Sequence, residues 1–138
     1  LSENTVREIA DWLQCGLQCW IHKMSGTMYF LPDINDPLLD PEPWSDVLSQ
    51  VEGRESEFAI FESMSGRMVY ATMMDFTYHL ESSSVKDDLE FALRSHKPIQ
   101  NFKFRVENSP FREEWFNFRF KAHMEWVRSQ LNCYELVS

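Results

Sequence analysis

Glycine is scarce in this sequence of 138 residues, which contains only 4. So few glycines argue against a glycine-rich phosphate-binding loop and against an all-β fold with many tight turns. The sequence also lacks the Gly-x-Ser-x-Gly, His-Glu-x-x-His and Walker motifs, which are typical of serine hydrolases, zinc peptidases and nucleotide-binding enzymes. These motifs therefore give no reason to expect a cofactor.

Positive charge is also in deficit, because 13 Lys and Arg face 22 Asp and Glu, for a net charge of −9. Such a field repels duplex nucleic acid and anionic membranes unless the basic residues gather on one face. No stretch approaches the roughly 20 apolar residues that a membrane-spanning helix needs. We therefore expect neither a nucleic-acid partner nor a membrane partner.

The chain has an odd number of cysteines, namely Cys15, Cys19 and Cys133. The sequence shows no signal-peptide pattern, so we expect reduced thiols and a cytoplasmic location. Cys15 and Cys19 are separated by one helical turn, but a zinc site needs two further ligands and only His22 is near. Gly16 also breaks the helical geometry between the two thiols. We therefore expect no metal site, and buried, unbridged thiols instead.

Hydrophobic periodicity predicts a mostly helical α+β fold in a single domain, residues 1–138. Five to six helices are expected around a long central C-terminal helix, at residues 3–14, about 40–51, 63–80, from 84, 98–107 and roughly 110–132. Residues 58–61 read either as a third strand or as an extended link. No repeat or Gly/Ser-rich linker indicates a domain boundary.

The clearest strand pattern is an N-terminal β-hairpin at about residues 18–31. A two-residue loop at Ser25-Gly26 would pair Trp20 with Leu31 and Ile21 with Phe30. Both faces of this hairpin are mostly apolar. We therefore expect it to be covered on both sides, or covered on one side and exposed for binding on the other.

The last predicted helix is apolar around more than half of its circumference. This pattern predicts a central position with Trp115 and Trp126 largely buried. Arg112 and Arg119 lie two turns apart on one line between the apolar stripes. Aligned guanidinium groups suit an anion site. The interpretation that we favour is a pair of structural ion pairs, because a partly buried charge must be paired.

The acids considered as partners for these arginines are Glu62, Asp75 and Glu113. His123 lies on an apolar face of the same predicted helix. It is expected to be a packing residue, and the alternative is a general base acting with Glu62 or Asp75.

Aromatic and methionine side chains are abundant, with 11 Phe, 5 Trp, 4 Tyr and 7 Met. Four of the methionines fall on the predicted helix 63–80, namely Met64, Met68, Met73 and Met74. Methionine is flexible and polarisable, so these residues indicate either core filling, which we favour, or an adaptable groove for a partner.

Several aromatic and basic residues resemble the signature of a known family. They are Phe102-Lys103, Arg112-Glu-Glu-Trp-Phe-Asn-Phe-Arg119 and Glu125-Trp126, with His22-Lys23 and Gly26, and Phe61-Glu-Ser-Met64, earlier in the chain. In this order they are similar to the bacterial uncharacterised protein family 0158 (UPF series), over most of residues 8–131. Members of that family usually carry an acid where this chain has Phe120. The resemblance implies no activity.

These patterns together favour a non-catalytic cytoplasmic binding or regulatory module that acts through protein contacts. The alternative is a small-molecule or anion binder, or an enzyme, that uses Arg112, Arg119 and His123. The first function requires an exposed apolar patch, and the second requires a concave pocket where charged groups converge. The sequence assigns no catalytic residues and does not predict the oligomeric state.

Overall fold

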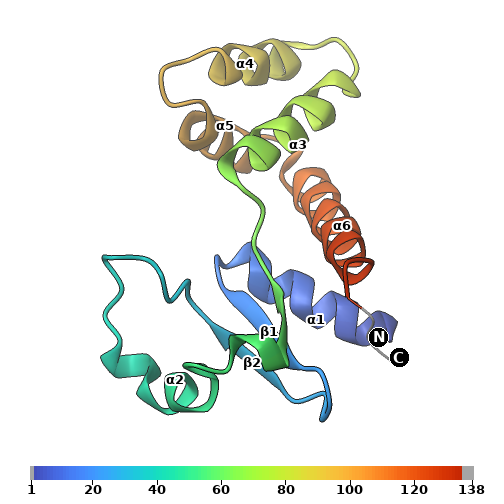
Figure 1. Ribbon diagram of the computed structural model, residues 1–138. Helices are drawn as coiled ribbons and strands as arrows, with labels where there is room; N and C mark the ends of the chain where they lie inside the picture. Colours follow the sequence, from blue (N-terminus) through green and yellow to red (C-terminus); the bar gives the residue numbers. More distant parts are fainter. Residues whose placement is uncertain (1, 135–138) are drawn as a thin grey trace. The chain divides into compact units, whose positions relative to one another are not determined.

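The protein is described by a computed structural model that places residues 2–134 (Figure 1). In order, its elements are α1 (Glu3–Gln14), β1 (Gln18–His22), β2 (Met28–Leu31), the 3-10 turn η1 (Glu42–Trp44), α2 (Ser45–Val51), η2 (Glu55–Glu57), β3 (Phe58–Phe61), α3 (Gly66–Tyr78), α4 (Ser84–Leu93), α5 (Pro98–Glu107) and α6 (Arg112–Leu131). The structure is 59% helical, with six α-helices and one three-stranded antiparallel sheet in the described part of the chain. The predicted mostly helical α+β class is confirmed.

The chain forms two compact units. Unit 1 contains residues up to Ser63 and those from His123 onward, and unit 2 is Met64–Ala122. The boundary between them therefore falls inside α6, which at 20 residues is the longest of the six helices in residues 2–134. That the two units make one domain remains a prediction.

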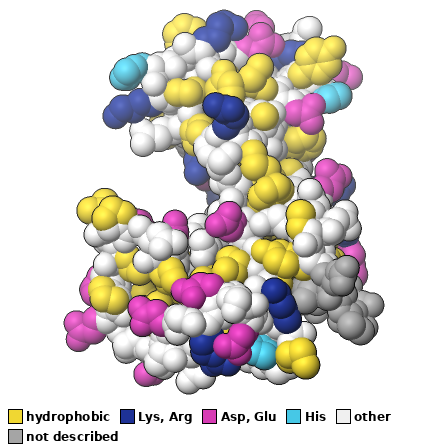
Figure 2. Space-filling model, viewed as in Figure 1, with side chains coloured by type: hydrophobic (Ala, Val, Ile, Leu, Met, Phe, Trp, Pro, Cys, Tyr) yellow, Lys and Arg dark blue, Asp and Glu magenta, His cyan; other side chains and the backbone are white. Residues whose placement is uncertain are grey.

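The net negative charge belongs to unit 1. Unit 2 contains nine Lys and Arg against eight Asp and Glu, whereas the rest of the chain contains four against fourteen. On the face drawn in Figure 2, acidic side chains gather over the region of α2 and the strands. Unit 1 is therefore strongly acidic and unit 2 is close to neutral.

The sheet of unit 1 has the strand order β2-β1-β3. The central strand β1 pairs antiparallel with both neighbours, so Cys19 lies opposite Phe30 of β2 and opposite Phe61 of β3. Residues 58–61, which the sequence left as a strand or a link, are a strand on the edge of the sheet.

The hairpin prediction was right in place and wrong in register. Trp20 pairs with Tyr29 and Ile21 with Met28, two residues away from the predicted partners. The loop is longer than two residues because Gly26, at φ 76°, returns its N–H to the His22 carbonyl at 2.8 Å. A shift of two residues leaves every side chain on its predicted face, since side chains alternate with a period of two.

Both faces of the sheet are covered, as in the first of the two predicted arrangements. Trp20 and Phe58 pack in one cluster with Leu48 and Val51 of α2. On the opposite face α1 packs against β1, and Trp12 contacts Phe30 with ring centroids 5.4 Å apart. The buried stripe of α1 is the predicted one, Val6, Ile9, Ala10 and Leu13.

Unit 2 has a core formed by α3, α4, α5 and the first half of α6. Trp115 lies inside it with no exposed surface and meets Phe76 and Phe102 edge-on, with ring centroids 5.3 and 5.0 Å away. The predicted burial of Trp115 is confirmed. Trp126, which belongs to unit 1, is only partly buried.

Local signals fix the ends of the helices in unit 2. The Oγ of Ser65 accepts the Met68 N–H, and the Oγ of Ser83 accepts the Lys86 N–H, so each serine caps one helix. Pro98 begins α5, where its missing N–H costs nothing.

No helix in residues 2–134 is both long enough and apolar enough to cross a membrane.

Candidate functional site

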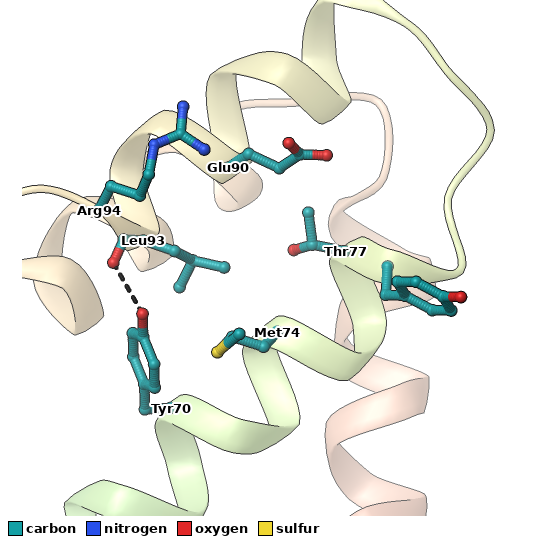
Figure 3. A pocket seen from close by; sticks show the side chains of 7 residues that line it. Tyr70, Met74, Thr77, Glu90, Leu93 and Arg94 are labelled. Carbon is teal, nitrogen blue, oxygen red and sulfur yellow. Dashed lines mark hydrogen bonds between the residues drawn. The ribbon is translucent and has the colours of Figure 1, made fainter.

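A concave groove of about 360 Å³ lies between α3 and α4 in unit 2. Its lining residues are Tyr70, Met74, Thr77 and Tyr78 of α3, with Glu90 and Leu93 of α4 and Arg94 just after that helix. Figure 3 shows the labelled side chains of the two helices on opposite sides of an open space. The groove has a volume within the range of about 300–1,000 Å³ that is usual for ligand pockets.

The framework of the groove is held by hydrogen bonds. The Tyr70 hydroxyl donates to the Leu93 carbonyl at 3.0 Å (Figure 3) and so ties α3 to the end of α4. That carbonyl lies in the last turn of α4, where backbone oxygens lack a helical donor. The buried Thr77 hydroxyl donates to the Met73 carbonyl at 2.8 Å. The hydroxyl groups of Tyr70 and Thr77 are therefore satisfied, and the walls of the groove present mainly carbon to a ligand.

The rim of the groove carries apolar side chains that remain open to solvent. Met74 is 50% exposed and Tyr78 is 78% exposed. Methionine adapts to irregular surfaces, and tyrosine combines an apolar ring with a polar tip. A solvent-exposed pair of this kind beside a cavity is typical of a binding surface.

Two opposite charges flank the groove one helical turn apart. Glu90 and Arg94 are four residues apart at the end of α4, and Figure 3 shows both at the α4 side of the space. Neither side chain makes an ion pair with another residue of the described chain. Both charges are available to groups on a ligand.

The two predicted site arginines meet at one aromatic ring. The guanidinium of Arg112 lies 5.2 Å from the centre of the Phe116 ring, and that of Arg119 lies 5.1 Å from it. Arg112 is exposed and forms no ion pair within residues 2–134. The predicted ion pair of Arg112 is therefore not found among these residues, and its guanidinium lies against an aromatic face instead.

Neither Asp75 nor Glu62 forms an ion pair with Arg112 or Arg119 among the pairs found in residues 2–134. Asp75 pairs with His79, with Oδ1 3.4 Å from Nδ1. The Glu62 backbone is held by side chains of α6, since its carbonyl accepts the Trp126 indole N–H at 2.6 Å. His123 is buried, at 6% exposure, and belongs to unit 1, whereas both arginines belong to unit 2.

Sequence reasoning missed most residues of the groove. It singled out Met74, but it offered core filling and a partner groove as rival interpretations of the same four methionines. Each interpretation fits one of these methionines, because Met73 is fully buried in the core and Met74 lines the groove. Nothing in the local pattern marked Tyr70 or Glu90, which only the packing of α3 on α4 brings together.

A charged network in unit 1 stabilises the hairpin loop. The Nδ1 of His22 accepts the N–H groups of Met24 and Ser25 at 3.3 and 3.2 Å, which leaves Nε2 to donate to Glu57 at 3.2 Å. Arg54 donates to the same carboxylate from Nε and Nη2 at 2.9 and 3.0 Å. The hydrogen bond from Arg54 and then that from His22 lower the pKa of Glu57 to about 2. Every group in this network is satisfied, which indicates a structural role.

The three cysteines form neither a disulfide nor a metal site within residues 2–134. Cys19 is buried as predicted, whereas Cys15 and Cys133 are exposed, so the prediction of buried thiols is wrong for these two. Burial raises the pKa of the Cys19 thiol to about 12, and the charge of Glu8 adds to the effect. Within residues 2–134 no three His, Cys, Asp or Glu side chains come close enough to hold a metal ion.

Comparison with known proteins finds no match to a protein-family model, to a curated protein or to a solved structure. The resemblance to family 0158 therefore stays a prediction. The groove between α3 and α4 is defined by geometry alone.

Proposed function

We propose that the protein is a non-catalytic interaction module whose α3–α4 groove receives an apolar side chain of a partner protein. The observation that carries this proposal is the exposure of Met74 and Tyr78 beside a groove of about 360 Å³. An apolar anchor entering a pocket is the usual centre of a protein interface.

The charges at the rim define the partner further. Glu90 and Arg94 lie about 6 Å apart along the helix, at 1.5 Å per residue. A matching segment carries an apolar residue with a basic group on one side and an acidic group on the other. Unit 2 is close to neutral, so it neither repels nor attracts such a segment at long range. Specificity then comes from contacts in the groove.

The test is a selection of binding peptides against the parent protein from a random phage-displayed library. The selected peptides are then measured against Met74→Glu, which places a carboxylate at the mouth of the groove. Leu38→Glu is the matched control, because Leu38 is 91% exposed and does not line the groove.

We expect the selected peptides to share an apolar residue flanked by opposite charges. Their affinity should fall at least tenfold for Met74→Glu and stay unchanged for Leu38→Glu. Peptides that bind Met74→Glu as tightly as the parent would show that the groove is not the binding surface.

An anion binder is the second candidate function. It is favoured by one observation, the placement of the Arg112 and Arg119 guanidinium groups against the same Phe116 ring. Two guanidinium groups against one ring bring two positive charges to the same part of α6, and guanidinium groups recognise carboxylate and phosphate. Its test is the anion dependence of thermal unfolding, which is taken up in the Discussion.

The proposed module retains the cytoplasmic location and the membership in bacterial family 0158 that the sequence suggested. The proposal includes neither a nucleic-acid partner nor a membrane partner, and it assigns no catalytic residue.

A further inference from the structure

Within residues 2–134, the outer edge of β3 is covered by side chains and not by another strand. β3 is at the edge of the sheet, and its inward partner is β1. In an antiparallel sheet, alternate residues of an edge strand point their N–H and C=O away from the neighbour. In β3, Ile60 points its backbone N–H and C=O away from β1. Glu62 follows two positions later, just beyond the end of the strand.

The end of α6 and Tyr134 supply the missing partners for this edge. The Tyr134 hydroxyl accepts the Ile60 N–H at 3.2 Å and donates to the Ile60 carbonyl at 3.0 Å. The Gln130 side chain accepts the Glu62 N–H at 2.8 Å and donates to the Glu62 carbonyl at 3.1 Å. We call these two side chains the edge clamp. A side-chain amide that both donates and accepts reproduces the bonding of a peptide group in an adjacent strand.

A pocket lies next to the edge clamp. A pocket of about 340 Å³ is lined by Ile60, Glu62, Gln130, Cys133 and Tyr134. The two residues whose backbone the clamp binds, Ile60 and Glu62, therefore line an open cavity. A chain that enters this cavity meets two residues whose backbone groups are spaced as a strand requires.

We propose that this edge is a docking site for an extended basic segment of a partner protein, which adds a strand to β3 and displaces the edge clamp. Recognition by strand addition uses the main chain for affinity and alternate side chains for selectivity. In the free protein the clamp keeps the edge closed, which prevents uncontrolled pairing.

Charge selects the occupant. The Glu62 carboxylate makes no ion pair within the described residues, and unit 1 as a whole has four basic against fourteen acidic residues. A Lys or Arg opposite Glu62 satisfies that carboxylate. A second copy of the chain is disfavoured, because edge-to-edge pairing would bring two strongly acidic units together. This surface belongs to unit 1 and does not depend on the groove in unit 2.

The test uses the variant Gln130→Met with Tyr134→Phe, which removes the polar atoms of the clamp and keeps its packing. The variant leaves the Trp126 indole N–H on the Glu62 carbonyl, so the groups that it frees are the Glu62 N–H and both backbone groups of Ile60. Tyr134→Phe retains the ring that lies 5.7 Å from Phe61. The probe is a fluorescent peptide with three Val-Lys repeats, and its binding is followed by fluorescence polarisation. Two further probes are the same peptide with every amide N-methylated and a Val-Glu peptide. Asn132→Ala is the matched control, since Asn132 is exposed in the same turn and makes no hydrogen bond to β3 within residues 2–134.

We expect the double variant to bind the Val-Lys peptide at least tenfold more tightly than the parent and Asn132→Ala do. The N-methylated and Val-Glu peptides should bind at least tenfold more weakly than the Val-Lys peptide. Amide hydrogen exchange at Ile60 and Glu62 should speed up in the double variant and slow again when the peptide is added. Each single variant keeps half of the clamp, so it should give a smaller gain with the fold intact by circular dichroism.

Three results would overturn the proposal. The first is equal affinity of the parent and the variants for the Val-Lys peptide. The second is equal binding of the N-methylated peptide, which would mean that the main chain is not recognised. The third is a dimer of the double variant in which Ile60 and Glu62 are protected without peptide, because the occupant would then be a second copy of the chain.

Discussion

The Tyr134 hydroxyl bonds to both backbone groups of Ile60, 74 positions earlier in the chain, at 3.2 Å from the nitrogen and 3.0 Å from the oxygen. One phenol therefore satisfies the full outward hydrogen-bonding capacity of an edge-strand residue. The contact ties the end of the described chain to the sheet of unit 1.

Tyr134→Phe should lower the free energy of unfolding by about 1–2 kcal/mol, because two hydrogen bonds to a partly buried backbone are lost while the ring is kept. Urea unfolding followed by circular dichroism measures the change. Tyr29→Phe is the matched control: Tyr29 is also partly buried in unit 1, but its hydroxyl makes no hydrogen bond among residues 2–134. Equal effects of the two substitutions would contradict the role of the Tyr134 hydroxyl.

Trp115→Ala should destabilise unit 2 by about 3–5 kcal/mol, because it empties a fully buried site in the core. Trp115→Phe should cost much less. The indole N–H of Trp115 has no hydrogen-bond partner among the described residues, so phenylalanine loses ring volume and no hydrogen bond. Circular dichroism in urea compares the two variants. An unmoved midpoint for Trp115→Ala would mean that the ring does not hold this core.

The secondary structure of this chain is largely encoded in local patterns. Periodicity placed the helices within a few residues, and the faces of the hairpin were predicted correctly. The register was not, because it depends on the loop. His22 binds the N–H groups of Met24 and Ser25 through Nδ1 and so stabilises a longer turn than Ser25-Gly26 alone suggests. A side chain that organises a loop from inside a strand leaves no signal in hydrophobic periodicity.

The candidate sites were mostly hidden from sequence reasoning, since both depend on tertiary packing. The groove requires Tyr70 to reach the carbonyl of Leu93, and the edge clamp requires Gln130 to reach Glu62. Such pairs are separated by tens of residues and share no motif. For Arg112 the sequence reasoning missed a partner that is close in the sequence. Its partner Phe116 is one helical turn away, yet the excess of acids in the composition favoured an ion pair instead.

The stability contributed by Glu57 should depend on pH. Its pKa is lowered from 4.5 to about 2 in the folded protein, so the folded state favours the ionised carboxylate. The contribution is complete above about pH 4.5 and is lost as the pH falls toward 2. The difference in unfolding free energy between the parent and Glu57→Gln should therefore shrink across that window. Urea midpoints from pH 6 to pH 2 measure it. Arg54→Gln should reduce this pH dependence, because the bond from Arg54 is the main cause of the shift, and an unchanged profile would assign the shift elsewhere.

Alkylation should separate the three thiols. Cys15 and Cys133 are exposed, whereas Cys19 is fully buried and its pKa is raised to about 12. Only the thiolate reacts, so iodoacetamide at pH 8 should modify Cys15 and Cys133 in the native protein and reach Cys19 only after unfolding. Mass spectrometry of tryptic peptides gives the sites. Modification of Cys19 at the same rate as the other two would show that β1 opens readily.

Arg112→Met should change the unfolding free energy by no more than about 1 kcal/mol, because an exposed guanidinium on an aromatic face contributes about 0.5–1 kcal/mol. Loss of one partner of a buried ion pair would instead cost about 3–5 kcal/mol.

The same variant, Arg112→Met, also tests the anion site. We expect thermal unfolding of the parent to show no more than a small shift, similar in phosphate, citrate and sulfate, because our first proposal gives these arginines no ligand. Arg112→Lys keeps the positive charge and is the control for Arg112→Met. A rise of several degrees with one of the anions, kept by Arg112→Lys and lost in Arg112→Met, would make Arg112 and Arg119 an anion-binding site and favour the second candidate function.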